Sequence, residues 1–207
     1  MRTTWRWPRD HDEGDLIVSE MDEVIPALVA AVQEQHATGD HYRDDAIRQA
    51  MEHQAQLALR PGPVRVDVIV DPPWSDGQIN SVQVVTGDRP FLVDTVVSCL
   101  LRHGWRVEDV RHPIIGVKRD RGTIEAVGTP GRGGCASESW IHIDVTAPLG
   151  TDIGQAAEQL RDDLCACLDQ VVCATDDWGA MHEAMLRTAE LVSASSGPAD
   201  DRDSSRE

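Results

Sequence analysis

Residues 84–110 read VVTGDRPFLVDTVVSCLLRHGWRVEDV, and this stretch decides the fold class. A strand pattern runs into a Gly-Asp-Arg-Pro turn, and Pro90 suits the first position of a helix because its missing N–H needs no partner there. Apolar residues then recur at helical spacing as far as His103, and Gly104 is a typical helix stop. A strand pattern resumes at Trp105. The stretch therefore predicts a strand–turn–helix–strand unit.

The same two patterns continue on both sides of this unit. Helical spacing of apolar residues predicts helices over 21–35 and 42–59, the second stopped by Arg-Pro-Gly-Pro. Period-two alternation predicts strands, and Pro113 suggests a bulge or an edge position within one of them. The expected strands are 64–70, 79–86, 105–119, 123–127 and 139–145, and the expected later helices are 90–103, one from about 151 and one over 176–191.

In chain order, these elements predict an α+β fold. From residue 64 the order is two strands, a helix, three strands and a helix, which favours an antiparallel-rich sheet with helices on one face. We divide the chain into an arm with two helices (1–60), an α+β domain (61–175), a C-terminal helix (176–191) and an acidic tail (192–207). The small and polar composition of the tail predicts disorder.

The charge of the chain excludes some classes of partner. It contains 36 acidic and 19 basic residues, for a formal charge of −17. Phosphates would be repelled over most of the surface, so neither nucleic acid nor an anionic membrane is an expected partner. Residues 61–150 contain 11 acidic and 9 basic residues, so most of the excess lies on the flanks. We expect these flanks to be solvated or to meet basic surfaces.

The pattern of apolar and cysteine residues points to the cytoplasm. No apolar run has the length of a signal peptide or of a membrane span. Five cysteines without a secretion signal predict reduced thiols in the cytoplasm. Because no CxxC or HxxxH pair occurs, no metal site is expected.

The turn before the central helix could bind an amino acid. Backbone N–H groups at a helix start can hold a carboxylate, and Arg89 could pair with the same group. Asp88 or Asp94 could take the amine, and Pro90 and Phe91 complete the candidate ligand-binding set. In the alternative interpretation, Asp88 caps the helix and Arg89 is solvated.

Other polar residues have competing interpretations. His112, His142 and Glu138 could form a metal-binding or proton-transfer cluster, or a polar face of the sheet. Alternation places Ser139 on the opposite strand face from His142, which argues against a nucleophile–base pair. A locally basic group comprises Arg102, Arg106, Arg111, Lys118, Arg119 and Arg121. It could bind acidic segments of this chain or of another subunit, or it could be solvated.

Four ordered segments carry a resemblance to a known family. The stretch 84–110 resembles the start of an ACT domain, a small amino-acid-sensing βαββαβ module. DRPFLVDTV from Asp88, RHPIIGVKRD from Arg111, ESWIHIDV from Glu138 and LCACLDQVVCATDDWGAM from Leu164 extend it. Together they resemble the N-terminal ACT-like region of the large bacterial NAD-specific glutamate dehydrogenases, over roughly residues 20–187. The further motif residues are His112, Pro113, Arg119, Asp120, Ser139, His142, Asp177, Trp178 and Met181.

The resemblance implies an ACT-like (ferredoxin-like) fold and a family reaction, the oxidative deamination of glutamate to 2-oxoglutarate with NAD. It also implies possible partners: an amino-acid effector, and a catalytic dehydrogenase subunit or a second copy of the chain. Family members continue for many hundreds of residues to a catalytic region, whereas this chain ends soon after Met181.

We expect neither catalysis nor a bound cofactor in this chain. Its GTPGRGG segment, 128–134, precedes a strand and does not match the dinucleotide fingerprint, and its one lysine, Lys118, lies mid-strand. The expected role is therefore regulatory or scaffolding. The alternatives are a stand-alone ACT-type amino-acid-binding module and a truncated, non-functional gene product.

Overall fold

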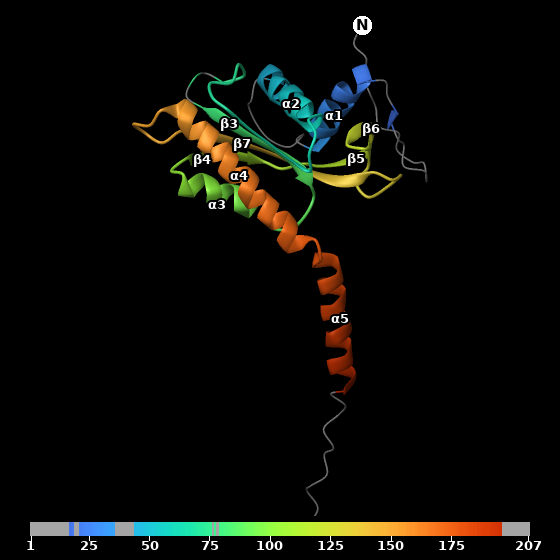
Figure 1. Cartoon of the computed structure of the whole chain (residues 1–207). Helices are drawn as coiled ribbons and strands as arrows, with labels where there is room; N and C mark the ends of the chain where they lie inside the picture. The colour runs from blue at the N-terminus through green and yellow to red at the C-terminus, as the bar shows by residue number, and fades with distance from the viewer. Residues whose placement is uncertain (1–16, 19–20, 36–43, 76, 78, 196–207) are drawn as a thin grey trace, which may run out of the picture. The chain divides into compact units, whose positions relative to one another are not determined.

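The computed structural model describes residues 17–18, 21–35, 44–75, 77 and 79–195. The chain divides into two compact units, residues 1–171 and 172–207. The elements, shown in Figure 1, are β1 (Ile17–Val18), α1 (Met21–Gln35), α2 (Asp44–Ala58), β2 (Val64–Ile69), β3 (Asn80–Gly87), α3 (Leu92–Arg102), β4 (Arg106–Arg111), β5 (Ile114–Asp120), β6 (Thr123–Gly128), β7 (Ala136–Thr146), α4 (Ile153–Thr175) and α5 (Trp178–Ser195).

The described strands form one seven-stranded antiparallel sheet. The strand order is β1-β6-β5-β7-β3-β2, and β4 also pairs with β7. Strand β7 is central, because β3 lies along one of its edges while β4 and β5 share the other. The expectation of an α+β fold with an antiparallel-rich sheet is confirmed.

The strand expected over residues 105–119 is two strands. β4 ends at Arg111 and β5 begins at Ile114, so the break falls at His112 and Pro113. Proline has no N–H to donate, which makes the interior of a ladder unfavourable for Pro113. Its carbonyl still accepts a hydrogen bond from the backbone N–H of Trp140, at 3.0 Å. The chain therefore bends at Pro113 without leaving the edge of β7.

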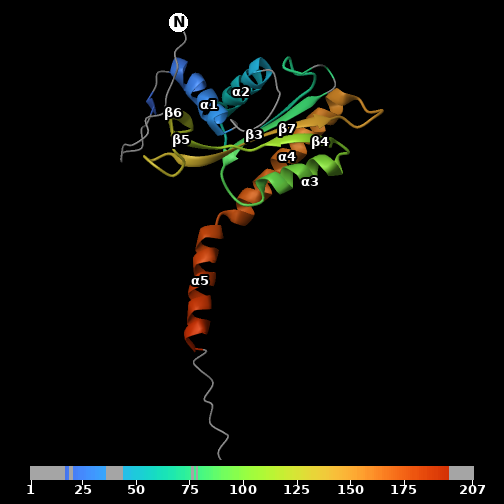
Figure 2. The ribbon, with the colours of Figure 1, turned by 180° about the vertical axis from the view of Figure 1, so that it is seen from behind.

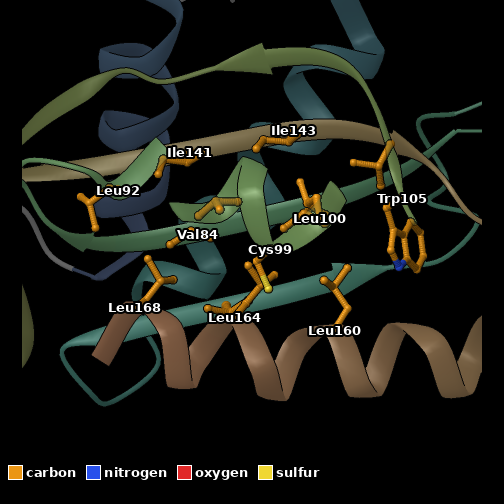
Figure 3. Packing of buried hydrophobic residues seen from close by; sticks show 14 of the residues in the cluster. Val84, Leu92, Cys99, Leu100, Trp105, Ile141, Ile143, Leu160, Leu164 and Leu168 are labelled. Atoms are coloured by element: carbon orange, nitrogen blue, oxygen red, sulfur yellow. The ribbon is translucent and has the colours of Figure 1, made fainter. Parts of the chain in front are cut away.

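Helices α3 and α4 cover one face of the sheet, as Figures 1 and 2 show from opposite sides. Alternate residues of β3 and β7, such as Val84 and Ile143, point to this face and have no exposed surface. They pack against Leu100 of α3 and Leu164 of α4, which are equally buried (Figure 3). This apolar layer is the core that the alternation predicts.

The opposite face of the sheet is covered by α1 and α2, so described helices of the first unit lie on both faces. Trp140 and Val85 point to this side and pack with Leu28 of α1 and Leu57 of α2. The expectation of helices on one face holds for α3 and α4 only. Because Trp140 is fully buried, its strand face had to be covered as well.

The start of α3 differs from the sequence-based expectation. The helix begins at Leu92, and Phe91 is its N-cap with a left-handed φ of 71°. Pro90 therefore lies in the turn before the helix. No side chain caps α3, so the alternative in which Asp88 caps it is wrong.

The two ends of the described chain also differ from expectation. Strand β1, which no pattern predicts, pairs with Val127 and Ala126 of β6. Helix α5 extends to Ser195, so residues 192–195 of the expected tail are helical. The arm over 1–16 and the tail over 196–207 lie outside the described residues. Within the described residues, no helix has the length and apolar character needed to cross a lipid bilayer.

Candidate functional site

Three of the sequence motifs meet around β7, although they are far apart in the chain. The turn after β3 is joined to β7 by a hydrogen bond from the N–H of Asp88 to the carbonyl of Ser137, at 2.9 Å. On the other edge of β7, Ile114 of β5 is in register with Ser139. Residues 88, 112–113 and 137–139 therefore lie at one end of the sheet, beside the start of α3.

Ser139 connects two surface groups at this end of the sheet. Its Oγ donates to Oδ1 of Asp88 at 2.6 Å, and His112 Nε2 lies 3.0 Å from the same Oγ. Ser139 is fully buried, whereas Asp88 and His112 are exposed. Because the hydroxyl proton points to Asp88, the serine accepts from His112 and is not arranged as a nucleophile with a histidine base. Partial burial lowers the pKa of His112, while nearby Asp88 opposes this shift.

Arg119 and Glu138 form a second motif contact, on the α1–α2 side of β7. Arg119 Nε lies 2.6 Å from Oε1 of Glu138 and Nη2 lies 3.0 Å from Oε2, a two-point contact. Trp140 Nε1 adds a longer bond to Oε2 at 3.4 Å. Burial, followed by repulsion from Arg119, lowers the pKa of Arg65 beside this pair. The ion pair therefore fixes β5 to β7 and has little surface to offer a ligand.

Of the five residues expected to bind an amino acid, Phe91 and Asp94 line a groove, and the contacts of the other three are as follows. Asp88 is bonded to Ser139, and Arg89 Nε donates to the carbonyl of Gly87 at 3.4 Å. Pro90 is half-buried in the turn. Phe91 and Asp94 instead line a groove along α3, so ligand binding by the full set stays a prediction.

This groove runs between α3 and α4 and has a volume of about 330 Å³. Arg102 Nη2 donates to the sulfur of Cys99 at 3.6 Å and to that of Cys167 at 3.5 Å. Burial raises the pKa of Cys99 to about 11, and Cys167 adds to the effect. The groove is lined by Phe91, Asp94, Thr95, Ser98, Cys99, Arg102 and Cys167.

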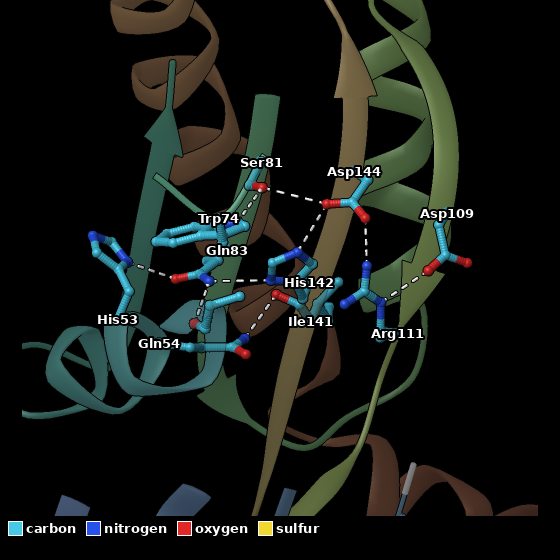
Figure 4. Close-up of polar contacts among 11 residues, drawn as sticks. His53, Gln54, Trp74, Ser81, Gln83, Asp109, Arg111, Ile141, His142 and Asp144 are labelled. Atoms are coloured by element: carbon cyan, nitrogen blue, oxygen red, sulfur yellow. Dashed lines mark hydrogen bonds and ion pairs between the residues drawn. The ribbon is translucent and has the colours of Figure 1, made fainter. Parts of the chain in front are cut away.

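His142, another motif residue, belongs to a buried chain of polar groups that sequence patterns did not reveal (Figure 4). Nδ1 of His53 in α2 lies 2.8 Å from Oε1 of Gln83 in β3. Nε2 of Gln83 donates to the carbonyl of Ala50 at 2.9 Å and lies 3.1 Å from Nδ1 of His142. His142 Nε2 lies 3.0 Å from Oδ1 of Asp144. An amide nitrogen only donates and a carboxylate only accepts, so His142 is assigned its proton on Nε2.

The chain of contacts continues to the edge of the sheet. Arg111 of β4 pairs with Asp144 through Nη2 and with Asp109 through Nε, the second contact at 2.8 Å. Burial is the main cause that lowers the pKa of His142, and its bond to Asp144 opposes this shift. The contacts tie α2, β3, β7 and β4 together, and burial favours the neutral form of His142.

Most of the basic group expected from the sequence is paired locally. Arg106 contacts Glu108 at 2.6 Å, and Lys118 contacts Glu125 at 3.1 Å. Arg111 and Arg119 have the carboxylate partners described above.

The described part of the chain contains no group of three or more His, Cys, Asp or Glu placed to hold a metal ion. His112, His142 and Glu138 belong to three separate sets of contacts.

A comparison with protein families decides what these motifs represent. The family model described as glutamate dehydrogenase, ACT1 domain, matches residues 27–164. The chain belongs to this family. The matched span begins within α1 and ends within α4, so it includes α2, α3, strands β2 to β7 and every residue that lines the groove except Cys167.

The ACT1 match includes most of the motif residues but not all of them. Asp88, His112, Arg119, Glu138, Ser139 and His142 lie inside the matched span with Pro113 and the exposed Asp120. Asp177, Trp178 and Met181 lie beyond it, in the second unit, where Met181 is about half exposed.

One signal of the buried polar chain was available in the sequence. Gln54 is a polar residue in the apolar stripe of α2, and it donates to the carbonyl of Ile141 at 2.9 Å.

Proposed function

We propose that this ACT1 domain is a regulatory and scaffolding segment of an NAD-specific glutamate dehydrogenase and has no catalysis of its own. The family reaction is the oxidative deamination of glutamate to 2-oxoglutarate. One observation carries the proposal: the motif side chains bond to one another. Asp88, Ser139 and His112 form one set, and Arg119 with Glu138 forms another. Side chains used in this way position strands and turns for contact with other parts of an enzyme.

The glycine-rich segment supports the same proposal, because it does not fit NAD. Gly128–Gly134 joins strand β6 to strand β7, so no helix N-terminus follows it to hold a pyrophosphate. Its amides also bond internally, with Gly131 N–H donating to the carbonyl of Cys135 at 3.0 Å. We therefore infer that NAD binds to another part of the enzyme. Five free thiols favour the cytoplasm as the compartment.

The test is an activity measurement on the purified chain. With glutamate and NAD, we expect no formation of NADH at any protein concentration, and NADH formation that scales with this chain would refute the proposal. The scaffolding part is tested by affinity purification from the native host. We expect a catalytic dehydrogenase chain to co-purify in an amount stoichiometric with this chain. Its absence would leave no support for scaffolding.

Amino-acid binding at the start of α3 is a second candidate function. Helix α3 begins without a side-chain cap, next to the exposed ring of Phe91 and to Asp94 in its first turn. We propose that an amino-acid carboxylate is bound there with help from Arg89. Calorimetry against a panel of amino acids is the direct test. The variant Arg89→Ala should lose the heat of binding while its unfolding curve stays unchanged, and an unchanged affinity would remove the pocket.

A further inference from the structure

Cys99 and Cys167 form a thiol pair that joins two helices. Cys99 lies on α3 and Cys167 on α4, and both sulfurs accept from the same guanidinium nitrogen of Arg102, at 3.6 Å and 3.5 Å. Cys167 is also among the causes that raise the pKa of Cys99, as expected for two neighbouring thiols. Both line the groove of about 330 Å³, so a small solute has a route to them. The pair therefore combines proximity, access and a neighbouring positive charge.

The two thiols differ in a way that assigns an order of reaction. Cys99 is 2% exposed and burial raises its pKa to about 11, whereas Cys167 is only partly buried. Thiolate, not thiol, is the nucleophile, and a cation such as Arg102 favours it. Cys167 should therefore attack first. Once its sulfur is bound in a mixed disulfide, its effect on Cys99 is removed while Arg102 still favours the Cys99 thiolate.

We propose that Cys99 and Cys167 are a redox modification site that reacts with a low-molecular-weight disulfide. The Cys167 thiolate attacks one sulfur of that disulfide, and the other leaves as a thiolate. The Cys99 thiolate then attacks Sγ of Cys167 and releases the second small thiolate. The protein gives up two electrons and two protons, the small disulfide is reduced to two thiols, and the new bond links α3 to α4.

The other cysteines lack this arrangement. Cys135 is buried in the turn between β6 and β7, and Cys173 is exposed in the second unit. Cys165 is partly buried on α4 and does not line the groove, and burial, followed by the charges of Asp169 and Asp162, raises its pKa. If Cys99 and Cys167 served only as small apolar core residues, they would show no preference for reaction with each other.

The test uses the full chain, reduced and then treated with oxidised glutathione at neutral pH. Intact-mass analysis should show a loss of about 2 Da, because forming one disulfide removes two hydrogens, with no adduct retained. Peptide mapping without reductant should recover Cys99 linked to Cys167. A persistent glutathione adduct on Cys167, linkage through another cysteine, or no reaction would each overturn the proposal.

Variants test the order of the two steps. Cys99→Ser should stop at a stable glutathione adduct on Cys167, and Cys167→Ser should yield neither that adduct nor the link. Cys165→Ser is the matched control on α4 and should form the Cys99–Cys167 link at the wild-type rate. Arg102→Gln should slow the link while leaving the reduced protein folded. Equal rates in Arg102→Gln and wild type would contradict the role of the guanidinium.

Discussion

The two faces of the sheet are buried by different means. Among the described residues, the face under α3 and α4 buries no Asp, Glu, His, Lys or Arg side chain. The face under α1 and α2 buries four such groups, Arg65, Glu138, His142 and Asp144. The first face is held by interdigitated apolar side chains. Helix α2 is also fixed by two directed hydrogen bonds: Gln54 donates to the carbonyl of Ile141, and Gln83 donates to the carbonyl of Ala50.

This difference shows what each face is suited to do. An apolar layer stabilises the fold in proportion to the apolar area that it buries, and this effect has no preferred direction. Such a layer tolerates small shifts, so α3 and α4 can leave a groove between them. A buried polar chain is favourable only when every member keeps its partner, so it fixes one position of α2. We infer that the α1–α2 face sets the register of the domain and that the α3–α4 face offers the adaptable surface.

The largest expected effect comes from placing a charge in the apolar face. Ile143→Asp should cost on the order of 5 kcal/mol and unfold the domain, because no partner is available for the carboxylate. Circular dichroism and urea titration measure the loss. The matched variant Ile143→Val should cost about 1 kcal/mol and stay folded. A folded Ile143→Asp protein would show that this face is not the dry layer described above.

The next effect concerns the polar face. Arg119→Met should cost about 3–5 kcal/mol of unfolding free energy, because Glu138 is left buried without its main partner. The double variant Arg119→Met, Glu138→Leu removes both charges and should recover most of that loss. Urea midpoints of the three proteins give the comparison. If the double variant is no more stable than the single one, the ion pair adds more to the free energy of unfolding than the cancelled cost of burying its two charges.

The free energy of unfolding should depend on pH because of His142, which is buried on the polar face of the sheet and has no counterpart among the described residues of the apolar face. The native state holds His142 with a lowered pKa because the ring is buried, whereas the unfolded state binds a proton near pH 6.5. As pH falls below about 6.5, the unfolded state binds more protons than the native state, so stability falls by up to about 1.4 kcal/mol per pH unit. The loss continues until the native pKa is reached.

The variant His142→Gln isolates this effect from the lowered pKa of His112, which acts in the same direction. Urea unfolding at pH 7.5 and pH 5.5 should show a smaller difference for His142→Gln than for the wild type. An identical difference in the two proteins would mean that the buried imidazole is not the group responsible.

The smallest effect is expected at the end of the sheet. Ser139→Ala removes the hydroxyl between Asp88 and His112, and both of these can turn to water because they are exposed. We expect a cost of about 1 kcal/mol, seen as a lower midpoint in thermal unfolding. If Ser139→Ala cost more unfolding free energy than Arg119→Met, the contacts of Ser139 would stabilise the fold more than the Arg119–Glu138 pair, contrary to this expectation.

The sequence was sufficient for the layer under α3 and α4, because period-two alternation and helical spacing act locally. It did not reveal that α1 and α2 cover the second face. Gln83, His142 and Asp144 alternate with apolar residues, and a polar alternation indicates a solvated face unless long-range contacts bury it. The position of Gln54 within an apolar stripe was the one local sign of such burial.

The candidate site was predictable in its members but not in its contacts. Asp88, His112 and Ser139 were each singled out from motifs, yet their pairing depends on the register of β3 and β5 against β7. Register is set by turn geometry and by which faces are buried, and neither follows from one strand alone. The break at Pro113 illustrates this, because it lets β4 and β5 share an edge that one straight strand would have filled.

The central position of β7 has a consequence for how the chain acquires its fold. The hairpins β2–β3 and β5–β6 pair locally, but β4 has no described partner except β7, and β7 alone joins the two hairpins. Hairpins form within microseconds, whereas pairings distant in sequence are slow. During synthesis the two halves must therefore wait until residues 136–146 have left the ribosome. We expect the sheet to close late, in one cooperative step.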